Sequence, residues 1–114
     1  MWSDGAVHAS DTAISLTIDG SPDLGSGVLQ SLYRITGRSS VELRDAIRAG
    51  EPVYTAALFG SDHIEVVPRL LRTLEHLDGL GLRRTIDEWR EGVRAPISRE
   101  VMLEILEVSD AEER

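Results

Sequence analysis

The stretch Ala13-Ile14-Ser15-Leu16-Thr17-Ile18 decides the fold class, because large apolar side chains alternate along it with small or polar ones. Successive side chains of a β-strand point to opposite sides, so Ile14, Leu16 and Ile18 predict one buried face. The turn-forming run Asp19-Gly20-Ser21-Pro22-Asp23 ends the strand. A small sheet with such a face needs helices to cover it, since the apolar side chains are not stable in water.

Two short helices are predicted to follow, with hardly any linker between them. Helical spacing of apolar residues begins at Val28, with Ser26 as the expected N-cap and Gly37 as the C-terminal stop. The sequence Ser39-Ser40-Val41-Glu42 matches a capping box, in which a serine accepts a backbone N–H and the glutamate reaches back. The second helix is expected to end at Ala49-Gly50.

The rest of the chain predicts two more strands and two more helices. Val53 to Phe59 has the composition of a strand, and an amphipathic helix that is regular from about Val66 follows it and closes at Asp78-Gly79. Leu80 to Trp89 alternates as an edge strand would, although its end would also suit a helix. Ser98 can cap the last helix.

These elements predict an α+β protein with a small three-stranded, mainly antiparallel sheet and helices on one face. The expected order is strand-helix-helix-strand-helix-strand, followed by an extra C-terminal helix. Residues 1–12 lack periodicity and predict a flexible N-terminal arm, and residues 13–91 form the α+β core. Residues 92–114, which begin with the breaks at Gly92 and Pro96, are assigned to an amphipathic helix with an acidic end in the same domain.

Composition argues against several classes of protein. The 114 residues include 20 acidic and 12 basic side chains, so the net charge is −8, and no lysine is present. Nucleic-acid binders need clustered positive charge, so no nucleic-acid partner is expected. The lack of cysteine excludes disulfides and thiolate metal sites. No apolar run approaches about 18 residues and no basic region opens the chain, which predicts a cytoplasmic protein without membrane contact.

The final helix carries a broad apolar stripe. Ile97, Val101, Ile105 and Val108 share one side, and Met102, Leu103 and Leu106 widen it. Such a stripe needs a surface to cover, so Ile97, Val101, Ile105 and Leu106 are expected to pack. They can pack on the helix's own sheet or on a second copy of the chain, so a monomer and a homodimer both remain open.

Short segments of residues 13–89 resemble two known families that share one compact fold. Ile35-Thr36-Gly37, followed by Glu42 and Arg44-Asp45, is similar to the junction between the first two helices of the C-terminal domain of the bacterial ribosomal stalk protein. Val28-Leu29-Gln30 and the later stretch from Leu82 to Glu88 look more like the Clp-protease adaptor ClpS. The resemblance covers about two-thirds of the chain, and its motifs are mostly structural.

The functional residues of these families match this chain poorly. The stalk domain recruits translation factors through lysines on its first two helices, and one such position falls at Gln30 here. The adaptor grips a substrate's amino terminus with an Asn-Asp loop and a histidine. The matching loop reads Asp19-Gly20, with a proline at Pro22, and the histidine position falls near Ile47. Both families bind proteins and have no catalysis of their own, so the resemblance implies binding.

The sequence therefore predicts a non-catalytic, adaptor-like protein-interaction module without a cofactor. Its partner surface is expected on the first two helices and the loop from Asp19 to Gly27, the region that the resembling families use. The acidity of the chain would suit a basic partner protein. The residues predicted to contact this partner are Asp19, Asp23, Leu29, Gln30, Tyr33 and Arg34.

The alternative is a small metabolite- or metal-binding protein, or an enzyme, that uses Asp19, Asp23 and His63. The acids beside His63, namely Asp62 and Glu65, fit the N-terminus of a helix better than a metal ion, so no metal is expected. No serine stands in a Gly-x-Ser-x-Gly elbow, and Gly25-Ser26-Gly27 is too short for a phosphate-binding loop. No catalytic residue is therefore predicted.

Overall fold

The computed structural model describes residues 12–20, 24–58 and 63–113. Within these ranges the chain forms four strands and four helices. Their order is β1 (Thr12–Ile18), α1 (Ser26–Thr36), α2 (Ser40–Ala49), β2 (Tyr54–Ala57), α3 (His63–Gly79), β3 (Arg84–Arg90), β4 (Val93–Ile97) and α4 (Arg99–Glu113). The predicted N-terminal arm lies outside the described residues except for Thr12, which begins β1.

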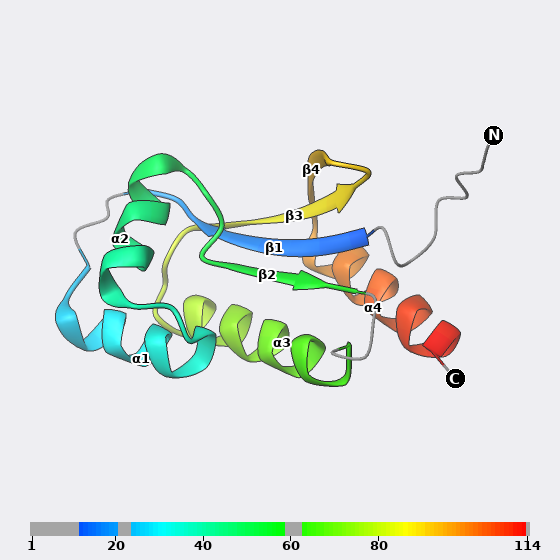
Figure 1. The fold of residues 1–114 in the computed structure, drawn as a ribbon, viewed down its shortest axis with the longest axis horizontal. Coiled ribbons are helices and arrows are strands. Elements are labelled where there is room, and N and C mark those ends of the chain that lie inside the picture. The colour runs from blue at the N-terminus through cyan, green and yellow to red at the C-terminus, as the bar shows by residue number, and fades with distance from the viewer. Residues whose placement is uncertain (1–11, 21–23, 59–62, 114) are drawn as a thin grey trace.

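The strands form one antiparallel sheet in the order β2-β1-β3-β4. β1 pairs with both of its neighbours, and Leu16 lies opposite Tyr54 of β2 and Ile86 of β3. In Figure 1 the helices α1, α3 and α4 lie below the sheet, with α1 and α2 at one end and α4 at the other. The prediction of an α+β fold with an antiparallel sheet is confirmed.

One hydrophobic core lies between the sheet and the helices. Ile14, Leu16 and Ile18 are buried in it, as their alternation predicts. All four helices contribute fully buried side chains, which include Leu29, Leu32, Leu43, Leu70, Leu74, Leu77 and Met102. Because burying one leucine stabilises a fold by about 1.5–3 kcal/mol, this core is the main driving force for folding.

Local sequence signals set the ends of α1 and α2. Gly37 ends α1 with a left-handed φ of 79°, and its N–H donates to the Tyr33 carbonyl. At the start of α2, Glu42 N–H donates to Ser39 Oγ and Ser39 N–H donates to Glu42 Oε1, so the capping box is confirmed. The Ser39 N–H holds the pKa of Glu42 below its ordinary value. Gly25, and not Ser26, is the N-cap of α1.

The sheet contains a fourth strand that the sequence did not predict. β4 follows β3 through the turn Glu91-Gly92, in which both residues have left-handed φ values of 52° and 81°. These angles belong to a type I′ turn, which usually has Asn-Gly or Asp-Gly at its centre. Because Glu91 departs from that pattern and Pro96 predicts a break, the hairpin was missed. The three-stranded sheet is corrected to four strands, and β3 lies inside the sheet rather than at its edge.

The last two helices differ from their predictions only at their boundaries. α3 is continuous from His63 although it contains Pro68, so the expected start near Val66 is late. α4 begins after Ser98, whose Oγ accepts the Val101 N–H at 3.1 Å as predicted. The preceding residues 93–97, which the sequence assigned to the final helical segment, form β4. None of the described helices combines the length and the apolar character that a membrane span requires.

Candidate functional site

The α1 residues predicted to contact a partner divide between the core and the surface. Leu29 is fully buried and therefore belongs to the core. Gln30, Tyr33 and Arg34 are exposed, and their spacing of three and four residues places them on one side of the helix. Tyr33 keeps 54% of its surface exposed. The predicted contact residues that are exposed on α1 therefore form one polar and aromatic stripe.

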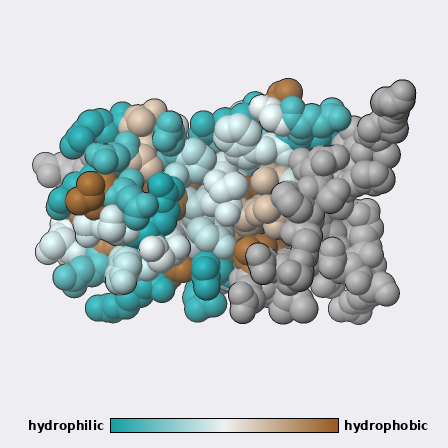
Figure 2. Space-filling model, in the orientation of Figure 1, coloured by the Kyte–Doolittle hydropathy of each residue, from teal (hydrophilic) through white to brown (hydrophobic). Residues whose placement is uncertain are grey.

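A second exposed stripe lies on α2. Val41 is 66% exposed, and Arg44 follows it one helical turn later on the same side. Among the side chains that the structure describes, no carboxylate lies within ion-pair distance of Arg34 or Arg44. α1 and α2 contact each other, and we define the α1–α2 surface as their two exposed stripes: the side chains of Gln30, Tyr33, Arg34, Val41 and Arg44. On the side seen in Figure 2, hydrophobic surface at this end forms small patches surrounded by hydrophilic surface.

The charge near the α1–α2 surface differs in sign from that of the whole chain. Residues 26–50 contain four arginines and two carboxylates, a net charge of 4 − 2 = +2, whereas the chain carries −8. Both carboxylates are engaged locally, Glu42 in the capping box and Asp45 in a 3.4 Å ion pair with Arg48. By contrast, α4 contains six carboxylates and one arginine. The α1–α2 segment and α4 therefore carry net charges of opposite sign in the sequence.

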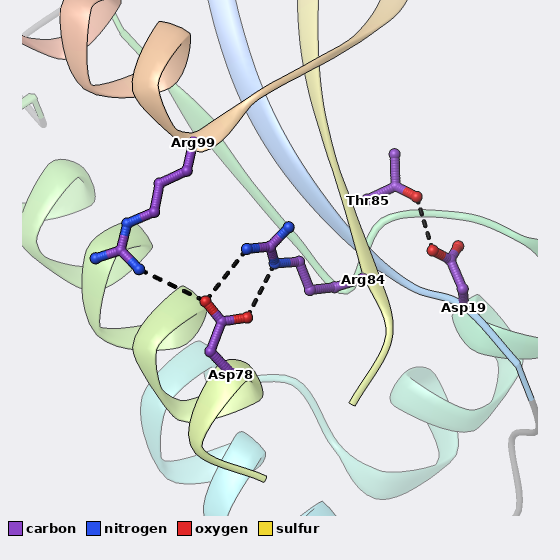
Figure 3. Close-up of polar contacts among 5 residues, drawn as sticks. All are labelled: Asp19, Asp78, Arg84, Thr85 and Arg99. Carbon is purple, nitrogen blue, oxygen red and sulfur yellow. Dashed lines mark hydrogen bonds and ion pairs between the residues drawn. The ribbon is translucent and has the colours of Figure 1, made fainter. Parts of the chain in front are cut away.

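Asp19 is held against the start of β3 by two hydrogen bonds. Thr85 Oγ1 donates a 2.7 Å hydrogen bond to Asp19 Oδ2 (Figure 3). In addition, Asp19 N–H donates to the Arg83 carbonyl at 2.9 Å. Asp23 and the side chain of His63 lie outside the described part of the structure. Of the three residues of the small-molecule alternative, the structure therefore describes the side chain of Asp19 alone.

Asp78 joins the end of α3 to the starts of β3 and α4. Arg84 donates to both of its carboxylate oxygens, from Nε to Oδ1 at 3.0 Å and from Nη2 to Oδ2 at 3.2 Å. Arg99 Nη1 lies 3.6 Å from Oδ2 (Figure 3). A carboxylate at a helix C-terminus is electrostatically unfavourable by itself, and the two guanidinium groups offset this effect. The cluster therefore holds the end of α3 against the starts of β3 and α4, which is a structural role.

Replacing Asp78 with alanine is expected to lower the free energy of unfolding by about 1 kcal/mol, because a two-pronged ion pair is lost from a partly exposed site. Urea unfolding monitored by circular dichroism measures this change. Asp45→Ala is the matched control, since its ion pair with Arg48 is about two-thirds exposed on both sides. Equal losses in the two variants would show that the Asp78 cluster does not tie the elements together.

The side of the sheet opposite the helices carries a polar network, which we call the polar sheet face: Ser15, Thr17, Asp87, Trp89 and Arg94. Trp89 Nε1–H donates to Ser15 Oγ at 2.8 Å. Arg94 donates from Nε to Asp87 Oδ2 at 2.9 Å and from Nη2 to Thr17 Oγ1 at 2.8 Å. Its guanidinium carbon also lies 5.5 Å from the centre of the Trp89 ring, within cation–π distance. The polar side chains of this face thus provide hydrogen-bond partners for one another, and the network stabilises the sheet.

A surface hollow of about 460 Å³ lies between α1 and α3. Its lining residues are Ile35, Arg72, Glu75, His76, Gly79 and Leu80. Ser31 Oγ donates its proton to the Val28 carbonyl at 2.8 Å, so the 2.8 Å contact with His76 Nε2 requires that this nitrogen donate. His76 is therefore fixed against α1. Within the described residues, no group of three or more His, Asp and Glu side chains is arranged to hold a metal ion.

The residues predicted to pack from the C-terminal helix lie at the edge of the core. Leu106 is buried with Met102, while Ile97 and Ile105 are half-buried against the same core. Val101 is exposed, and Ile97 belongs to β4 rather than to the helix. The buried side of α4 is therefore centred on Met102 and Leu106, and it faces the sheet of its own chain.

The polar sheet face and the hollow were not predicted from the sequence. The outward alternation of Thr85, Asp87 and Trp89 could have indicated the first, but its partner Arg94 is identified only once the β3–β4 hairpin is known. The hollow depends on the packing of α1 against α3, which has no signal in the local sequence.

Comparisons with protein-family models, curated proteins and solved structures find no match for this chain. Its function is therefore inferred from its own residues.

Proposed function

We propose that this protein is a non-catalytic protein-interaction module that binds its partner through the α1–α2 surface. The observation that carries this proposal is the high exposure of Tyr33 and Val41 on neighbouring helices. Tyrosine and arginine are enriched among the residues that dominate binding energy at protein interfaces. The α1–α2 surface combines an exposed aromatic and an exposed aliphatic side chain with the guanidinium groups of Arg34 and Arg44.

The partner is proposed to present an acidic segment. The net charge of −8 suggested a basic partner, but charges are screened beyond about 8 Å at physiological ionic strength. The charge close to the contact therefore decides the complementarity, and residues 26–50 carry +2. No described carboxylate side chain pairs with Arg34 or Arg44, so the carboxylates of a partner protein can pair with them.

Two considerations favour binding over small-molecule chemistry. The stalk and adaptor families, which segments of the sequence resemble, both bind proteins. The small-molecule alternative depends on Asp19, whose carboxylate already accepts a hydrogen bond from Thr85. An engaged, exposed carboxylate is a weaker candidate for a ligand than a set of converging polar groups in a pocket.

Val41→Asp is expected to weaken binding of the partner at least about tenfold, because the change places a charge where an apolar contact is proposed. Proteins captured from the source lysate by the wild-type chain are identified by mass spectrometry. Their affinity is then measured by titration with the wild-type and variant chains. Arg44→Glu is expected to act in the same direction, and binding to the wild-type chain is expected to weaken as salt rises.

Val93→Asp is the matched control, since Val93 is 67% exposed on β4 and Val41 is 66% exposed on α2. Both variants gain the same charge on an exposed valine, so only the location of the change differs. Equal affinity of Val41→Asp and the wild-type chain for every captured protein would contradict the proposal. Recovery of no specific protein at low or at high salt would also contradict it.

A further inference from the structure

The two edges of the sheet differ in how far they can accept another strand. The type I′ turn makes Arg90 and Val93 a hydrogen-bonded pair, so by alternation the backbones of Arg94 and Pro96 point away from β3. Pro96 has no N–H, so this edge lacks one of the donors that an added strand would need. Proline and charged side chains are the usual protection of an edge strand against pairing. The β4 edge is therefore protected.

The β2 edge lacks this protection. Leu58 N–H donates to the Thr12 carbonyl at 3.0 Å, so by alternation the backbone groups of Ala56 point toward β1 and those of Thr55 and Ala57 point outward. Each of these two residues presents one N–H and one C=O at the edge. No residue from Val53 to Leu58 is charged, although charged residues make up 28% of the chain. No described segment pairs with this side of β2.

Apolar side chains of α3 continue the surface beside β2. Val66, Val67 and Leu71 are only partly buried where they pack against the core. α3 runs along β2, and Tyr54 Oη donates to the Val66 carbonyl at 3.4 Å. In Figure 2 the middle of the molecule, where Figure 1 shows β2, is mostly white to tan, whereas the surface around α2 is mostly teal with brown patches. The edge therefore combines free backbone groups with weakly polar and apolar surface.

We propose that this edge binds a second copy of the chain, so that two β2 strands pair antiparallel around a two-fold axis at Ala56. In this register Thr55 of each copy lies opposite Ala57 of the other. All the outward N–H and C=O groups of both residues are then satisfied. A register centred on Thr55 would instead pair Ala57 with Val53, whose N–H already donates to the Leu16 carbonyl at 2.8 Å. The pairing joins two four-stranded sheets into one continuous sheet and places the α3 helices of the two copies side by side.

The difference between the β2 edge and the β4 edge explains why the proposed assembly stops at two copies. A two-fold contact uses the same edge of both copies and leaves only the two β4 edges at the ends of the joined sheet. Those edges are protected by Pro96, so further strand addition is disfavoured. A second copy fits better than an acidic or basic partner, because the β2 edge has no charge for such a partner to complement.

The dependence of dimerisation on salt separates this contact from the α1–α2 surface. Two copies of charge −8 repel each other at long range, and salt screens that repulsion. The dimer is therefore expected to become stronger as salt rises, whereas binding of an acidic partner to arginines weakens. Failure of one proposal is thus distinguishable from failure of the other.

Thr55→Lys is expected to convert a dimer into a monomer, because it places a charge in the centre of the paired edge. Sedimentation equilibrium measures the mass, which for the wild-type chain is expected to approach twice 12.5 kDa as concentration rises. Ala95→Lys is the matched control, since it adds the same charge at an exposed position of the protected β4 edge. Circular dichroism checks that each variant remains folded.

Amide hydrogen exchange locates the contact independently of any variant. The N–H groups of Thr55 and Ala57 are expected to exchange more slowly as the concentration of the wild-type chain rises. The proposal is overturned if the wild-type chain remains monomeric up to about 0.5 mM in high salt, since a contact that weak is not specific. It is also overturned if a dimer forms while these two amides exchange at an unchanged rate, or if folded Thr55→Lys dimerises as strongly as the wild-type chain.

Discussion

Replacing Arg94 with alanine is expected to lower the free energy of unfolding by about 3 kcal/mol, since a buried carboxylate is left without its partner. The Asp87 side chain is only 4% exposed, and Arg94 is the guanidinium that lies 2.9 Å from it. Arg94 also donates to Thr17 and stacks on Trp89, and both contacts are lost. Because the Arg94 side chain is about one-third exposed, water replaces part of the interaction. The expected loss is therefore at the lower end for a buried pair.

Urea unfolding monitored by circular dichroism tests this prediction, and the melting temperature is expected to fall by on the order of 10 °C. Arg90→Ala is the control, because its ion pair with Glu88 lies in the same hairpin and the Arg90 side chain is 56% exposed. Arg90→Ala is expected to lower the free energy of unfolding by less than about 1 kcal/mol. Adding Asp87→Asn to Arg94→Ala should recover part of the stability, since the uncompensated charge is removed. No recovery would show that the charge of Asp87 is not the cause.

Leu106→Asp is expected to destabilise the chain by about 4 kcal/mol, which combines the loss of a buried leucine with the burial of a carboxylate. Leu106 is 6% exposed and lies in the core with Met102, which is fully buried. Since both side chains pack within their own chain, the change in melting temperature is expected to be independent of protein concentration at concentrations where the chain is monomeric. Thermal unfolding over a range of low concentrations measures this.

Leu103→Asp is the matched control on the same helix, because Leu103 is 39% exposed. It is expected to cost less than about 1 kcal/mol. If α4 detaches from the sheet while the rest of the chain stays folded, helical circular dichroism falls before the main transition, and this outcome also supports the packing of Leu106. Identical melting curves for Leu106→Asp and the wild-type chain would show that α4 is not packed through this side.

The features that the sequence determined by itself are those with a complete local signal. The alternation of Ile14, Leu16 and Ile18 is enough to define one buried face of β1, because side chains of any strand alternate. Gly37 stops α1 and the Ser39–Glu42 capping box starts α2 through bonds between residues four positions apart or fewer. The exposure of Gln30, Tyr33 and Arg34 follows from helical spacing in the same way.

Only the tertiary structure decided the features that depend on pairing between distant segments. β4 exists because Glu91 adopts a left-handed φ inside a hairpin, a conformation that its side chain does not favour alone. The contact of Arg94 with Thr17 joins residues 77 positions apart, and no local pattern encodes that partner. The sequence also placed Leu29 with the surface of α1, whereas packing of α1 against the sheet buries it. Hydrogen bonds within a turn or helix are set by neighbouring residues, but the choice of strand partners and of the buried side of a helix is made by the whole chain as it packs.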